Sequence, residues 1–111
     1  MATYNFPDHK KGDTFPGTVF TIVQNSLPVD LTNYTIRMHL RPARASSTLS
    51  QNMTSSIEIH DPAAGKFRIN PVVIDLPART YYHDIEFTNT VTGAIRTWIE
   101  GTWNVTQDVT R

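Results

Sequence analysis

Four histidines are the residues of this sequence best suited to acid–base or metal chemistry. His9, His60 and His83 each adjoin an aspartate, and His39 stands in an alternating segment. Neighbours on a β-strand point to opposite faces, so His83 and Asp84 do not face one ligand. The sequence contains no His-x-His pair, no His-Glu-x-x-His motif and no carboxylate-rich calcium loop. We therefore predict no metal site and no cofactor, and interpret the histidines as surface residues at strand ends.

Nucleophilic catalysis also lacks its usual residues. The sequence has no cysteine and no Gly-x-Ser-x-Gly motif, and most of its serines fall between residues 46 and 56. The Ser- and Thr-rich residues 43–56 are typical of a long exposed loop or a loosely held edge segment, whereas a catalytic serine needs rigid placement beside a base. Asp84 and Glu86 share one strand face, where pairing with arginine across strands is the simpler interpretation. We predict that the protein is not an enzyme.

Aromatic residues in the last third of the chain offer a different chemistry, because exposed rings can stack on sugars. The candidates are Tyr81, Tyr82, Trp98 and Trp103. Carbohydrate-binding modules occur on β-sandwich folds, so a sugar-binding or adhesin function is an open alternative. Packing between two sheets is the simpler interpretation, because Tyr and Trp fill such a space well.

Basic side chains supply candidate protein contacts. One strand face carries a basic row, which in an assembling protein would pair with acidic residues of a neighbour and fix its register. The N-terminal segment, the 43–56 loop and the C-terminal tail are further candidates. The proposed contact residues are Lys10, Lys11, Arg37, His39, Arg41, Arg44 and Arg111.

The elements that must position these residues are β-strands, because the dominant period of the sequence is two. Residues 34–41 alternate apolar and polar side chains until Pro42, as a half-buried antiparallel strand does. Similar strands are expected at 14–23, 57–59, 67–69, 81–87, 94–100 and 102–106, with a bulge at Gly101. Residues 70–79 predict one helical turn or an irregular crossover. About seven short strands favour an all-β, immunoglobulin-like antiparallel β-sandwich, with a small closed barrel as the alternative.

Length and charge set the remaining limits. A chain of 111 residues, 39% hydrophobic, suffices for one core, and we divide it into an extended arm (1–11) and a sandwich domain (12–111). Ten basic and ten acidic residues cancel, so neither nucleic acid nor a membrane is an expected partner. No apolar run reaches the roughly 20 residues of a membrane helix, and no secretory signal is present. Synthesis in the cytoplasm is expected.

Several short motifs, in order, have a familiar layout. Gly12-Asp13-Thr14-Phe15 opens the first strand, and residues 27–32 (LPVDLT) introduce the second. Residues 61–67 (DPAAGKF) form a turn, 76–78 (LPA) precede the Tyr-rich strand, and 101–106 (GTWNVT) close the chain. This layout resembles small immunoglobulin-like domains of tailed-bacteriophage virions, including the N-terminal domain of phage baseplate upper proteins. The resemblance covers about residues 12–111. One departure is Arg79-Thr80, where these domains often carry a glycine.

The resemblance implies a virion structural protein, made in the host bacterial cytoplasm and placed at the tail, neck or baseplate. Its expected partners are copies of itself and other virion proteins, as a homo-oligomer in the assembled particle. A capsid decoration or head-fibre protein would keep the fold and change only the partner. Because the chain ends where the sandwich ends, we expect this domain to be the whole protein.

Overall fold

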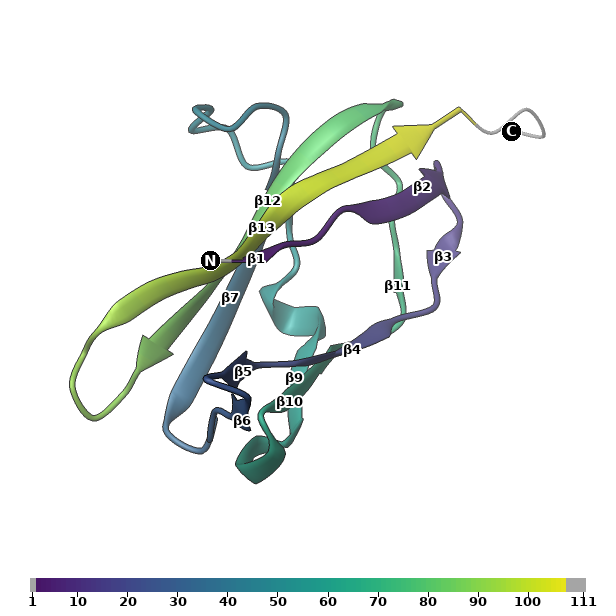
Figure 1. The fold of residues 1–111 in the computed structure, drawn as a ribbon. Helices are drawn as coiled ribbons and strands as arrows, with labels where there is room; N and C mark the ends of the chain where they lie inside the picture. The colour runs from purple at the N-terminus through teal and green to yellow at the C-terminus, as the bar shows by residue number, and fades with distance from the viewer. Residues whose placement is uncertain (1, 108–111) are drawn as a thin grey trace.

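Short strands dominate the computed structural model, which describes residues 2–107 (Figure 1). The strands are β1 (Ala2–Thr3), β2 (Phe6–Lys10), β3 (Thr14–Phe15), β4 (Thr18–Thr21), β5 (Val23–Gln24), β6 (Leu27–Pro28), β7 (Tyr34–Arg41), β8 (Gln51–Asn52), β9 (Ile57–Asp61), β10 (Lys66–Ile69), β11 (Val72–Val73), β12 (Arg79–Asn89) and β13 (Ile95–Thr106). Two single-turn 3-10 helices, η1 (Thr54–Ser56) and η2 (Pro62–Ala64), lie before and after β9.

The strands form two layers. A six-stranded sheet has the order β1-β13-β12-β7-β8, with β2 also paired to β13. Facing it are the three-stranded sheet β4-β10-β9 and two small pairs, β3 with β11 and β5 with β6 (Figure 1). The all-β sandwich predicted from the sequence is confirmed.

Three long strands build the large sheet, and their alternation explains the core. In β12 the residues at 81, 83, 85 and 87 are buried, and in β7 those at 36, 38 and 40 are buried. The antiparallel register places Ile85 opposite both Met38 of β7 and Ile99 of β13, so the apolar residues of neighbouring strands share one face. The strand predicted at 34–41 has those bounds in the structure.

Gly101 lies inside an unbroken strand, which corrects the expected interruption. The bulge in the β12–β13 ladder lies before Gly101, at Trp98. Ile85 pairs with Ile99 and Glu86 pairs with Thr97, so Trp98 is the extra residue. Gly101 has a different role. A Cβ atom there would lie 1.9 Å from the carbonyl oxygen of Tyr4, so only glycine lets the N-terminal segment approach this closely.

Residues 2–10 of the N-terminal segment are largely extended, and most of them belong to the sandwich. β1 and β2 both run parallel to β13, and the Tyr4 amide donates to the Glu100 carbonyl at 2.8 Å. The Phe6 side chain is only 5% exposed and belongs to the core. Residues 2–10 therefore form the outermost strand segment of the large sheet, paired with β13.

The remaining segments depart from the sequence prediction in detail. Within the expected 43–56 loop, β8 pairs with β7 and Met53 is fully buried. The single strand expected at 14–23 is divided into β3, β4 and β5, with Gly17 at φ +91° between the first two. Residues 70–79 contain no helical turn. They include the short strand β11, which pairs with β3, and the start of β12 at Arg79, and Ile74 between these strands is fully buried in the core.

Candidate interaction surface

An apolar groove opens along one edge of the sandwich. It runs between β1 and β13 of the large sheet and β4 and β5 of the facing layer, with a volume of about 470 Å³. Its large apolar lining residues are Tyr4, Phe20, Ile22, Val23, Val29, Trp98 and Ile99. The groove is therefore a place where the two layers do not close over their own core.

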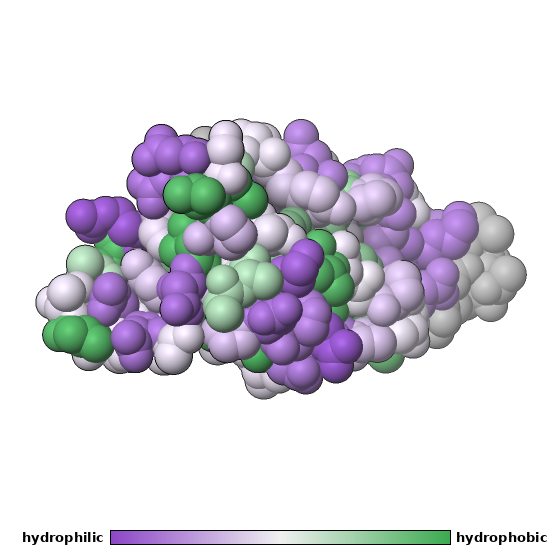
Figure 2. All heavy atoms as spheres, turned by 60° about the horizontal axis from the view of Figure 1, so that its bottom comes forward, coloured by the Kyte–Doolittle hydropathy of each residue, from purple (hydrophilic) through white to green (hydrophobic). Residues whose placement is uncertain are grey.

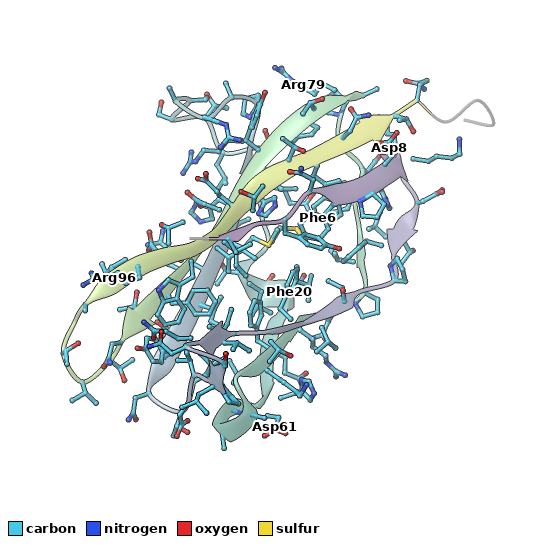
Figure 3. All side chains as sticks on the ribbon, viewed as in Figure 1. Phe6, Asp8, Phe20, Asp61, Arg79 and Arg96 are labelled. Carbon is cyan, nitrogen blue, oxygen red and sulfur yellow. The ribbon has the colours of Figure 1, made fainter. Side chains whose placement is uncertain are left out.

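Packed aromatic rings hold this groove in shape. The ring of Phe20 meets Tyr4 edge-on at a centroid distance of 5.1 Å and stacks on Phe67 at 5.2 Å. Trp98 packs on Phe87 at 4.7 Å, because the bulge turns its indole toward the core. Figure 3 shows Phe6 and Phe20 between the layers. Because the lining rings are fixed by buried neighbours, the groove exists before any partner arrives.

One wall of the groove is a free strand edge. Phe20 pairs with Phe67 in β10, and the Ile22 amide donates to the Gly65 carbonyl at 2.8 Å. In an antiparallel ladder, alternate residues direct their backbone groups to opposite sides. The N–H and C=O groups of Val19, Thr21 and Val23 therefore point away from β10. Within residues 2–107, no strand pairs with that side of β4.

Exposed apolar side chains follow the same edge. Val19 is 53% exposed, Val23 is 55% exposed, and Leu27 in the adjoining hairpin is 68% exposed. Residues 14–29 contain no Lys, Arg, Asp or Glu. Figure 2 shows apolar patches among hydrophilic side chains on the side of the molecule that includes the bottom of Figure 1. Exposed apolar surface beside an open edge is typical of an interaction site.

The predicted basic row lies on the opposite, outward face of the large sheet, and its members already contact groups of this chain. Arg37 lies 3.6 Å from the Glu86 carboxylate, the cross-strand pairing expected for that acid. Arg44 lies 3.8 Å from Glu100. Arg41 donates to the Ser47 carbonyl at 3.0 Å and contacts His39 Nδ1 at 3.3 Å. These ion pairs are largely exposed and contribute little to stability. That the basic row contacts a partner protein stays a prediction.

A small polar hollow of about 90 Å³ lies on that outward face. His39, Arg41 and Arg44 line it together with Tyr82 and two carboxylates. The Arg44 guanidinium carbon lies 5.0 Å from the Tyr82 ring centroid. This volume accommodates a few water molecules and no sizeable ligand.

Two histidines are buried, which corrects the expectation that all of them lie on the surface. His83 is 3% exposed, and its Nε2 donates to the Tyr4 carbonyl at 2.8 Å. His9 Nε2 lies 2.8 Å from the Asp13 carbonyl. Desolvation lowers the pKa of His83 below its usual 6.5. Within residues 2–107, no group forms a hydrogen bond with its Nδ1. Each imidazole hydrogen-bonds a backbone carbonyl of another segment, so both histidines stabilise the fold.

The four candidate sugar-stacking residues do not form a platform. Tyr81 and Trp103 are 2% and 1% exposed and belong to the core, so neither can meet a sugar. Tyr82 is half-buried on the outward face, and Trp98 is half-buried against Tyr34, at a centroid distance of 5.4 Å on the groove side. The two rings that remain accessible therefore lie on different faces of the large sheet.

The terminal candidates are placed differently from one another. Lys10 is exposed at the end of β2, and the Lys11 ammonium forms an ion pair with Asp75 at 2.8 Å. Arg111 lies outside the described residues. The sequence analysis did not select Val19, Thr21 and Val23 as candidate contact residues. The feature of the sequence that could have indicated them is the absence of charged residues between 14 and 29.

Groups for other chemistry are not assembled in the described structure. Among residues 2–107, no group of three or more His, Asp or Glu side chains is placed to hold a metal ion. No helix in this part of the chain has the length and apolar character needed to cross a membrane. The sequence matches no protein-family model, and a comparison with the curated proteins also gave no match.

Proposed function

We propose that the protein is a non-enzymatic structural component of a tailed-bacteriophage virion. In this role several copies assemble at the tail, neck or baseplate through protein–protein contacts. The observation that carries the proposal is the groove and free strand edge between β1 and β4, which present main-chain groups and apolar side chains together. The virion setting comes from the resemblance in motif order described above.

This surface has the character of an interface. Soluble proteins usually protect an open edge with lysine, proline or a covering segment, whereas β4 and β5 contain neither a charged residue nor a proline. Protein interfaces combine an apolar centre with a polar rim, and here the exposed Thr21 and Gln24 lie beside the exposed valines. In an assembly with many copies, weak contacts of this kind gain strength through multivalency.

A capsid decoration or head-fibre protein is the nearest alternative, because the same surface would serve a different neighbour. A carbohydrate-binding module is the alternative from another class. The burial of Tyr81 and Trp103 removes half of its candidate rings, and the accessible pair, Tyr82 and Trp98, lies on two faces. A glycan array tests the carbohydrate-binding alternative. Glycan binding by the wild type that is lost in Tyr82→Ala or Trp98→Ala would favour the adhesin function.

Particle composition tests the virion role. We expect quantitative mass spectrometry of purified particles whose genome encodes this sequence to find the chain in several copies per particle. Immunogold labelling in the electron microscope would then place it at the tail end or on the capsid, which separates the two structural alternatives. Absence of the chain from purified particles would overturn the proposal.

A further inference from the structure

We infer that the free edge of β4 and β5 pairs with the same edge of a second copy, antiparallel and about a two-fold axis at Thr21. This dimer joins the two three-stranded sheets into one continuous sheet. The inference rests on the self-assembly in the proposed function, and it adds the surface, the register and the symmetry of the contact.

The main chain is arranged for this pairing. Since Phe20 and Ile22 direct their backbone groups to β10 and to the hairpin, Val19, Thr21 and Val23 direct theirs outward. The Ile22 carbonyl, for example, accepts from the Val29 amide at 2.9 Å on the inner side. With Thr21 on the two-fold axis, Thr21 forms a hydrogen-bonded pair with Thr21 of the second copy, and Val19 forms such a pair with the second copy's Val23.

The side chains match in the same register. Thr21 lies opposite Thr21 of the second copy, and Val19 lies opposite its Val23, so the exposed valines of the two copies meet. On the other face, Phe20 lies opposite the second copy's Ile22, which extends the apolar cover beside the groove. A contact about a two-fold axis needs a self-complementary surface, and this strand is symmetric in residue character about Thr21.

Charge selects this edge over the other strand edges of the described chain. The opposite outer strand of the small sheet, β9, carries Glu58, His60 and Asp61, and β2 carries Asp8 and Lys10. The outer strands β1, β3, β6, β8 and β11 have only two residues each, which is too short for an extended pairing. Between residues 14 and 29 there is no charge to repel a second copy, and the whole chain has a formal net charge of zero. A second copy is therefore the occupant that this uncharged, self-matching edge fits.

The test is the mass of the full chain in solution, measured by light scattering over a range of concentrations. The chain has a mass of 12.6 kDa, and we expect a concentration-dependent rise toward twice that value. The double variant Val19→Lys with Val23→Lys places like charges opposite each other, and we expect its dimer dissociation constant to rise by about tenfold or more. The double variant Val19→Lys with Val23→Glu places opposite charges there instead, so its dimer should persist.

A matched control and a folding check make each outcome decisive. Val73→Lys adds one lysine at an exposed valine of β11, away from the β4 edge, and should leave the dimer unchanged. Far-ultraviolet circular dichroism and the melting temperature confirm that each variant folds. A wild-type oligomer that both double variants leave intact would overturn the β4 contact but not self-assembly. A wild-type chain that is monomeric at every concentration would overturn the dimer, while the particle-composition experiment still decides the virion role.

Discussion

The ring of Phe6 stacks on the indole of Trp103, with centroids 4.0 Å apart and planes 13° apart. Phe6 belongs to the N-terminal segment and Trp103 to the last strand, so this contact joins the two ends of the described chain. Phe15 meets both rings edge-on, with its centroid 4.9 Å from Trp103 and 5.7 Å from Phe6. The N-terminal segment is thus fixed by core packing as well as by its backbone hydrogen bonds.

Replacing Phe6 with alanine should destabilise the fold strongly. The side chain is buried, and removing a buried phenylalanine costs about 3–5 kcal/mol through lost burial and the cavity left behind. Chemical denaturation measures this as a drop in the free energy of unfolding. Lys10→Ala, at an exposed position on the same strand, is the control and should change it by less than about 0.5 kcal/mol. Equal effects of the two substitutions would show that the segment does not contribute to the core.

Gly101→Ala should detach the first strand while leaving the rest of the sheet in place. The new Cβ would collide with the Tyr4 carbonyl, which backbone geometry fixes, so the N-terminal segment must move. Overpacking of this kind costs about 1–3 kcal/mol. Hydrogen exchange should show faster exchange at the Tyr4 amide, which donates to Glu100 in the wild type. Arg96→Ala on the same strand is the control, and unchanged protection of Tyr4 in Gly101→Ala would contradict the close approach.

The burial of Met53 gives a test of the 43–56 segment. Met53 is fully buried and its amide donates to the Met38 carbonyl at 2.8 Å, so this segment is fastened to β7. Met53→Ala should lower the free energy of unfolding by about 2–5 kcal/mol. Leu49→Ala removes a similar side chain from an exposed position in the same segment and should have a small effect. A small loss in both variants would restore the interpretation of this segment as a loosely held loop.

Sequence pattern predicted those parts of the fold whose burial repeats along one strand. β7 and the inner face of β12 followed from alternation because each strand has one face in the core and one in solvent. The contribution of Phe6 was missed because one buried ring in a short polar segment has no period. Tyr4 and Phe6, two residues apart, were the available signal.

Contacts distant in sequence account for the other differences. Gly101 was assigned to a bulge because glycine in a strand marks either a bulge or a close approach of another segment, and the approaching Tyr4 is at the far end of the chain. The burial of His83 likewise depends on the Tyr4 carbonyl. The free edge of β4 was not predicted, because which strands lie outermost is a property of the topology.

His83 should make the fold sensitive to mild acid. Its pKa is lowered in the folded state because burial disfavours the imidazolium, so the unfolded chain binds a proton more readily. The stabilisation from the neutral ring is complete above pH 6.5 and is lost as the pH falls below 6.5 toward the folded-state pKa. Melting temperatures measured between pH 8 and pH 5 should therefore fall in the wild type.

The variant His83→Gln isolates this effect, because glutamine keeps an N–H donor for the Tyr4 carbonyl and does not titrate. We expect it to be less stable than the wild type at pH 8 but to lose less of its melting temperature on acidification. His60→Gln, at an exposed histidine, is the control and should follow the wild-type pH dependence. If His83→Gln and wild type lost stability in parallel over this range, another group would be responsible for the acid sensitivity.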